Sequence, residues 1–128
     1  MRFLVLIVVA ALAACSPPAS ESAKEPMPSV APQPESFATD AWVGKWIGVE
    51  GNILEIASAG APGLYAINEV TLDGPKSYTG NAEGAAIGFT DGDRRLTIRA
   101  STGDETGLKY LAGKENCLVI EEGRGFCR

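Results

Sequence analysis

Glycine divides this chain into two unlike parts. All fifteen glycines follow residue 43, the first being Gly44, and they recur at short intervals up to Gly125. Glycine weakens the interior of a helix or strand but suits a tight turn, so this spacing leaves room only for short elements joined by turns. Runs of Val, Ile, Leu and aromatic residues lie between the glycines. The second part of the chain is therefore predicted to consist of short strands.

The clearest hairpin surrounds a turn at Thr90–Asp93. Apolar side chains alternate with small or polar ones on both sides of this turn. A turn centred on residues 92 and 93 pairs Phe89 with Leu96. The next pair on the same face is then Ile87 with Ile98, so one face is apolar and the other carries arginines.

Several other segments have the same character. The other candidate strands run from Lys45 to Val49, Ile53 to Ala57, Leu64 to Leu72, Lys76 to Gly80, Cys117 to Glu121 and Gly125 to Cys127. The stretch from Thr106 to Gly113 differs, because Thr106 can cap a short helix, Gly113 can end it, and Leu108 and Leu111 share one face. About seven to eight short strands with one short helix near the C-terminal end predict an all-β fold, a small antiparallel β-barrel or sandwich.

The first residues have the features of a signal peptide. Met1–Arg2 supplies one positive charge, and Phe3–Ala14 is an uninterrupted apolar run. This run is too short for a transmembrane helix, which needs about 20 residues. The sequence Leu12-Ala13-Ala14-Cys15 resembles the bacterial lipobox. The resemblance implies a lipoprotein signal peptide over residues 1–14 and a lipid on Cys15; the alternative is an ordinary signal peptide with a chance cysteine.

A lipid on Cys15 would anchor the chain firmly, because several acyl chains hold a protein on a membrane far more strongly than one. Ser16 follows the cysteine, where Asp is the best-known signal for retention in the inner membrane. By resemblance, the protein is expected in the outer membrane of a Gram-negative bacterium, facing the periplasm.

Proline dominates the next segment. Six of the eight prolines lie between Ser16 and Ser36, in a stretch without glycine. Such a composition cannot bury enough apolar surface to offset the entropy of ordering, so residues 15–36 are predicted to form a disordered tether. The alternative, a Pro-rich ligand for a partner domain, lacks a basic residue beside a clean P-x-x-P. The β domain is predicted over residues 37–128.

Two more cysteines remain once Cys15 carries lipid. Cys117 and Cys127 then form the one obvious pair, in a compartment that favours disulfides. If the chain turns near Glu122, Cys117 falls opposite Cys127 in a hairpin. We therefore predict a structural disulfide. A redox role is the alternative, but it usually takes a closer pair such as C-x-x-C.

Charge and composition argue against several functions. Sixteen acidic side chains against eleven basic ones give a net charge of -5, which disfavours nucleic acid as a partner. Histidine, the commonest general base and metal ligand, is absent from the sequence. The acidic residues lie mostly at expected turns, as in Asp91-Gly92-Asp93, a pair that lacks the further ligands of a calcium loop. We expect no catalytic residue, no metal and no cofactor, and the protein is predicted not to be an enzyme.

Two resemblances bear on the domain. Gly44-Lys45-Trp46 is similar to the G-x-W signature of lipocalins and avidins, which implies a barrel with Trp46 closing one end and a small apolar ligand inside. The candidate lining residues are Trp42, Trp46, Tyr65, Tyr78 and Phe89; alternatively, they simply fill the core. The chain as a whole resembles a group of small proteobacterial lipoproteins with no established activity, through residues 106–117 and 123–128. This likeness implies a shared fold and no mechanism.

Three functions follow as hypotheses. The first is a non-catalytic envelope lipoprotein whose domain contacts another protein or the cell wall. Its candidate contact residues are Arg95, Arg99, Lys109, Tyr110 and Arg124. The second is a calycin-like carrier of a small apolar molecule. The third is an inhibitor of lysozyme-type wall hydrolases, since small acidic barrel lipoproteins include such inhibitors, although their S-G-x-x-Y loop is not seen in this sequence.

Overall fold

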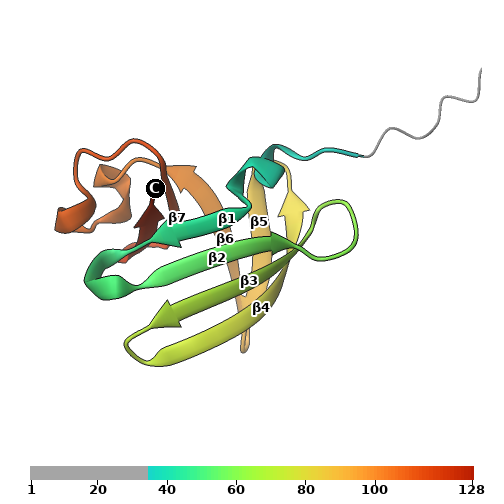
Figure 1. Cartoon of the computed structure of the whole chain (residues 1–128), viewed down its shortest axis with the longest axis horizontal. Coiled ribbons are helices and arrows are strands. Elements are labelled where there is room, and N and C mark those ends of the chain that lie inside the picture. Colours follow the sequence, from blue (N-terminus) through green and yellow to red (C-terminus); the bar gives the residue numbers. More distant parts are fainter. Residues whose placement is uncertain (1–34) are drawn as a thin grey trace, which may run out of the picture. The chain divides into compact units, whose positions relative to one another are not determined.

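Eight strands form a closed antiparallel barrel in chain order (Figure 1). The structure, a computed structural model, describes residues 35–128. The strands are β1 (Gly44–Ile47), β2 (Ile53–Ser58), β3 (Leu64–Thr71), β4 (Gly74–Glu83), β5 (Ala86–Asp91), β6 (Arg94–Ser101), β7 (Cys117–Glu121) and β8 (Arg124–Cys127). The predicted fold class is confirmed, as a barrel. Within the described range, no helix is long and apolar enough to span a membrane. The predicted signal peptide, Cys15 and the tether up to residue 34 lie outside the described residues.

The hairpin predicted at Thr90–Asp93 forms with the expected register. Phe89 pairs with Leu96, and Ile87 pairs with Ile98, across β5 and β6. All four side chains are buried. Strand β4 is longer than the predicted Lys76–Gly80 segment, because it pairs with β3 over residues 74–81 and with β5 over residues 80–83.

The barrel interior is filled by one apolar cluster. Alternating residues from all eight strands point inward, as strand geometry requires. The buried members are Trp46, Leu54, Ile56, Tyr65, Ile67, Ile87, Phe89, Leu96, Ile98, Leu118, Ile120 and Phe126. Trp42, Tyr78 and Ala82 pack against this cluster from positions that are partly buried.

A short 3₁₀ helix, η1 (Ala38–Trp42), packs on the end of the barrel where Tyr65 lies. The Tyr65 hydroxyl donates to Asp40 Oδ1 at 2.5 Å and lies 2.8 Å from the Thr39 hydroxyl. The hydrogen bond from Tyr65, followed by one from the backbone of Phe37, lowers the pKa of Asp40. The indole N–H of Trp46 donates to the carbonyl oxygen of Trp42 at 2.8 Å, so buried polar groups fix η1 to the barrel.

The C-terminal residue ties the same region together. The guanidinium carbon of Arg128 lies 4.0 Å from the ring centroid of Trp46, a cation–π contact. Arg128 also donates to the carbonyl oxygens of Ala41 at 2.6 Å and Val43 at 3.4 Å. These contacts connect the last residue to the segment that precedes β1.

The segment between β6 and β7, here called the 102–116 loop, differs from the prediction. In place of one helix from Thr106 to Gly113, it contains two single 3₁₀ turns, η3 (Asp104–Thr106) and η4 (Lys109–Leu111). Gly107 separates them because it adopts a left-handed conformation, with φ of 72°. The helix prediction was therefore wrong.

The predicted cysteine pair is joined as a disulfide. Cys117 pairs with Cys127 across β7 and β8, with their Cα atoms 4.0 Å apart. Both cysteines are buried in a second, smaller apolar cluster with Leu111, against which Val49 and Leu108 pack. The disulfide therefore lies beneath the 102–116 loop, and the two leucines expected on one helical face do share this cluster.

Removing the disulfide is expected to weaken the domain without unfolding it. A bridge that closes a loop of ten residues restricts the unfolded chain by about 2 to 3 kcal/mol. The C117A/C127A double variant should lose this amount of unfolding free energy. Urea denaturation of the variant and of the disulfide-bonded parent protein, without reductant, measures the difference. A loss below about 1 kcal/mol would contradict the structural role assigned to the bridge.

Candidate functional site

The inward-facing positions change from apolar to charged at one end of the barrel. We call this end the mouth; it carries the β1–β2, β3–β4, β5–β6 and β7–β8 connections. On β3, Tyr65 and Ile67 belong to the apolar cluster, and the next residue on that face is Glu69. On β8, Phe126 belongs to the cluster, and the preceding residue on that face is Arg124. The mouth thus places charges directly above the core.

Glu69 and Arg124 form a buried ion pair at the base of the mouth. The Arg124 Nε donates to Glu69 Oε1 at 2.8 Å, and Nη2 donates to the other carboxylate oxygen. The side chain of Glu69 is 2% exposed and that of Arg124 is 18% exposed. The hydrogen bonds to Glu69 raise the pKa of Arg124 further above its usual value, although burial lowers it. The two-point contact fixes the orientation of both groups.

Asp91 and Tyr78 extend this pair on one side. Asp91 Oδ2 lies 3.9 Å from Arg124 Nη1 and 3.8 Å from Lys76 Nζ. The Tyr78 hydroxyl donates to Asp91 Oδ2 at 3.2 Å and lies 3.4 Å from Arg124 Nη2. Burial raises the pKa of Tyr78, and Arg124 partly opposes that rise. Tyr78 therefore stays a neutral hydrogen-bond donor at physiological pH.

Glu121 extends the pair on the other side. Its carboxylate accepts from Arg124 Nη1 at 3.4 Å and from Arg94 Nη2 at 2.6 Å. The hydrogen bond from Arg94, with a smaller contribution from Arg124, lowers the pKa of Glu121. Glu121 is thereby held ionised, which suits it to charge pairing rather than to accepting a proton in catalysis.

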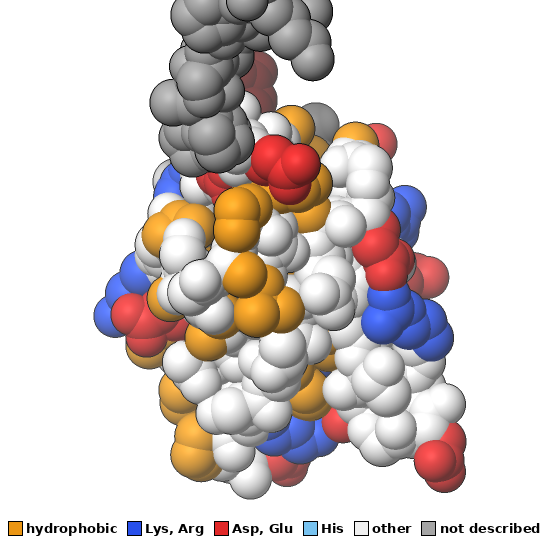
Figure 2. Space-filling view, turned by 90° about the vertical axis from the view of Figure 1, so that its right-hand side faces the viewer, with side chains coloured by type: hydrophobic (Ala, Val, Ile, Leu, Met, Phe, Trp, Pro, Cys, Tyr) orange, Lys and Arg blue, Asp and Glu red, His pale blue; other side chains and the backbone are white. Residues whose placement is uncertain are grey.

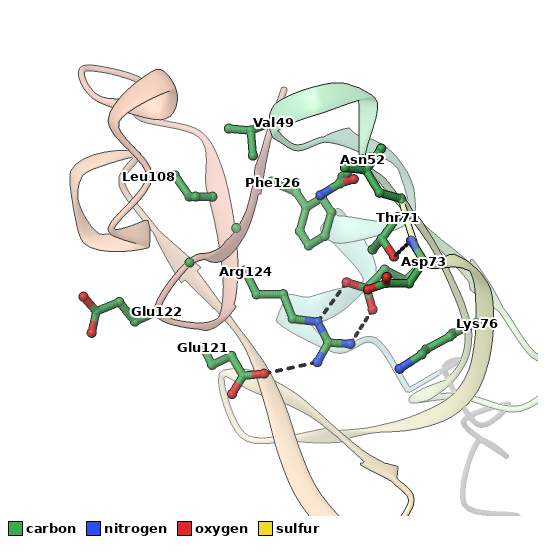
Figure 3. Close-up of a pocket in the computed structure, with 14 residues that line it drawn as sticks. Val49, Asn52, Thr71, Asp73, Lys76, Leu108, Glu121, Glu122, Arg124 and Phe126 are labelled. Carbon is green, nitrogen blue, oxygen red and sulfur yellow. Dashed lines mark hydrogen bonds and ion pairs between the residues drawn. The ribbon is translucent and has the colours of Figure 1, made fainter.

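An open pocket of about 430 Å³ lies over these charges (Figure 3). Figure 3 shows Asn52, Thr71 and Asp73 on one side of the pocket and Leu108 on the other, with Arg124 between them. The backbone N–H of Asp73 donates to the Thr71 hydroxyl at 3.3 Å. The pocket has the size of a binding site for a side chain or a small molecule.

The side of the barrel opposite the mouth has fewer charged groups at its centre. Figure 2 shows that side, near the β2–β3 connection, with apolar and uncharged groups in the middle and charged groups toward the edges. A second open pocket there, of about 330 Å³, is lined by Asp40, Ser58 and residues 60–64. The Asp40 carboxylate already accepts hydrogen bonds from Tyr65 and the Phe37 backbone. The mouth is therefore the better candidate site.

The five aromatic residues predicted to line a ligand cavity lie in or against the core. Trp46, Tyr65 and Phe89 are buried in the apolar cluster, and Trp42 and Tyr78 pack against it. The ring centroids of Tyr78 and Phe89 are 4.9 Å apart. None of the five lines the pocket at the mouth, although Tyr78 takes part in the ion-pair network beneath it.

The predicted contact residues fall into three places. Arg95 forms an ion pair with Glu83 on the outer wall, and Arg99 is exposed on the same strand. Lys109 and Tyr110 lie together on the 102–116 loop, where Tyr110 is 85% exposed. Arg124 points inward, into the mouth network. The structure therefore brings Lys109 and Tyr110 together and separates them from the other three.

Sequence analysis did not single out Glu69, the buried carboxylate of the mouth, and assigned Asp91 to a turn. A signal was present, because Glu69 shares its strand face with Tyr65 and Ile67 and so interrupts an apolar face with a charge. Glu69 and Arg124 are 55 positions apart, and only barrel closure brings them together. Among residues 35–128, no group of three metal-ligating side chains is placed to hold a metal ion. No protein-family model, curated protein or solved structure matches the chain.

Proposed function

We propose that this protein is a non-catalytic lipoprotein of the Gram-negative envelope, anchored by a lipid on Cys15, whose β domain contacts another protein. The contact surface consists of the 102–116 loop and the adjoining mouth. The filled interior supports this proposal over an apolar-ligand carrier, because the residues that would line a cavity pack against one another. The side chains that can contact a ligand or partner therefore lie on the surface of the domain.

The observation that carries the proposal is the bracing of the 102–116 loop. Gly103 N donates to the Lys114 carbonyl at 2.7 Å, and Gly123 N donates to the Thr106 carbonyl at 2.8 Å. Thr106 is fully buried against Gly125. Long loops are usually mobile or functional, and this one is held in place by contacts to β8 and by the cluster around the disulfide.

This bracing presents Tyr110 to solvent on a fixed support. Tyrosine is enriched at the energetic centres of protein interfaces, and a loop that is already ordered loses less conformational entropy on binding. Lys109 is exposed beside it, and Leu108 lines the pocket of the mouth. The loop and the mouth therefore form one continuous surface.

Site-specific photo-crosslinking in cells tests the proposed contact. A photoreactive amino acid at position 110 should give discrete cross-linked species, identified by mass spectrometry. The same amino acid at Arg99, which is exposed on the outer wall, is the matched control and should give none of them. Identical products from both positions, or none from position 110, would overturn the proposal. Products released by a muramidase would identify the cell wall as the partner instead of a protein.

The lipid anchor is tested separately. Because a lipid on Cys15 would hold the protein on the membrane, the Cys15→Ala variant should move from the membrane fraction to the soluble fraction. The C117A/C127A double variant is the control, since it removes the other two cysteines but should leave membrane association unchanged. Unchanged association of the Cys15→Ala variant would refute lipid anchoring at this residue.

A further inference from the structure

The pocket at the mouth has two carboxylates, Asp73 and Glu122, that its ion-pair network does not use. Beneath the pocket, three carboxylates are paired with three cations. They are Glu69, Asp91 and Glu121, paired with Lys76, Arg94 and Arg124. Asp73 and Glu122 line the same pocket, and in the described part of the chain neither carboxylate forms an ion pair. The network is balanced, so Asp73 and Glu122 leave the lining with two uncompensated negative charges. Of the two, Glu122 points away from Arg124 in Figure 3.

A second acceptor lies on the same side of the pocket as Asp73. The Oδ1 atom of Asn52 is buried and has no hydrogen-bond partner among the described residues. Buried polar atoms are rarely left without a partner, because the loss of hydration is costly. Asn52 Oδ1 and the Asp73 carboxylate, which lie on the same side of the pocket, are both acceptors. They call for a ligand that carries N–H donors and a positive charge.

The rest of the lining is apolar. Val49, Leu72 and Leu108 line the pocket, and Leu72 is 78% exposed. Figure 3 shows Val49 and Leu108 beyond the charged groups, toward the 102–116 loop. Lysine and arginine match such a combination, since their methylene stems lie along apolar surface while the charged head reaches a polar group. A simple inorganic cation has no apolar surface and would gain nothing from these apolar contacts.

We infer that the mouth binds the side chain of a lysine or arginine from the partner protein. The cationic head meets Asp73 and Asn52, and the stem lies against Leu72, Leu108 and Val49. This inference rests on the proposed function and names the chemistry of the partner. The pocket of about 430 Å³ has room for one such side chain with part of its backbone.

Agmatine, a guanidinium group joined to an ammonium group by a four-carbon chain, is the probe for this site. Titrated into the full chain in detergent, it should shift the backbone amide signals of Asp73 and Gly123 saturably in ¹⁵N NMR spectra. Asp73→Asn should weaken binding about tenfold, because it removes the charge and keeps a residue suited to the turn. Aminoethylguanidine, which keeps both charged groups but has two methylenes fewer, should bind about tenfold more weakly than agmatine.

Glu122→Gln is the matched control. Glu122 is on the same rim and loses the same charge, but Figure 3 shows its side chain pointing away from Arg124. It should change agmatine binding less than about twofold, an effect of long-range charge only. Equal losses in the two variants, equal binding of aminoethylguanidine and agmatine, or no saturable binding would each overturn the inference.

Cross-linking from position 110 separates this inference from the proposed function. Asp73→Asn should reduce the yield of the cross-linked partner, agmatine should compete with it, and Glu122→Gln should leave it unchanged. If the partner is captured but neither change affects it, the inference is wrong and the proposed contact stands. If position 110 captures nothing while agmatine binds, the proposed function is wrong, and so is the assignment of the cation to a protein partner.

Discussion

Replacing Arg124 with methionine is expected to destabilise the domain by about 3 kcal/mol or more. The change leaves Glu69, whose side chain is 2% exposed, as a buried carboxylate without a cation. Removing one partner of a buried pair costs more than the pair contributes, because the remaining charge has lost both water and its counterion. Urea denaturation of the two proteins at pH 7 measures the difference.

A double variant shows whether the unpaired charge is the cause. Glu69→Gln added to Arg124→Met removes the charge and keeps the shape, and it should recover more than half of the lost stability. Arg95→Met is a control, since its partner Glu83 is on the exposed outer wall, and it should cost less than about 1 kcal/mol. A double variant no more stable than Arg124→Met alone would show that lost packing, not the buried charge, sets the effect.

Gly103→Ala is expected to displace the 102–116 loop and to cost about 3 kcal/mol. A Cβ atom at this position would lie 1.6 Å from the carbonyl oxygen of Leu111, which is backbone and cannot rotate away. Leu111 covers the disulfide, so its displacement also opens the smaller apolar cluster. Thermal unfolding measures the loss, and photo-crosslinking from position 110 should fall with it.

Gly60→Ala separates this clash from backbone conformation. Gly60 has a φ of +83° and nothing near its would-be Cβ atom, so alanine there costs only about 1 to 2 kcal/mol of conformational energy. Gly103 has an ordinary φ of -61°, which alanine adopts freely. If Gly103→Ala were no more destabilising than Gly60→Ala, the tight packing assigned to the loop would be wrong.

The features that sequence predicted best are local ones. The Phe89–Leu96 pairing and the Cys117–Cys127 pairing each depend on one turn and on the alternation beside it, and both appear in the structure. All eight segments predicted as strands are strands, since glycine turns mark their ends. The helix prediction failed at Gly107, where a left-handed residue breaks the pattern that Leu108 and Leu111 suggested.

The mouth could not be predicted in the same way, because it depends on barrel closure. Arg124 was expected to be an exposed contact residue, and although Glu121 lies three residues before it, nothing near it in sequence indicates its buried partner. Its partner Glu69 lies on β3, and the two meet only because their strands lie in the same closed sheet. Burial of an arginine is decided by such distant contacts, whereas strand pairing across a turn is decided by its neighbours.

The closing seam of the barrel has a consequence for the order of folding. β8 pairs with β7 through a short hairpin that the disulfide secures, but it meets β1 through the pair Ile47 and Cys127, from opposite ends of the domain. The C-terminal hairpin can thus form and oxidise early. The pairing of β8 with β1 forms only after the strands between them have folded. A chain that lost β8 would keep two open strand edges, on β1 and β7, and is expected to aggregate rather than settle into a smaller barrel.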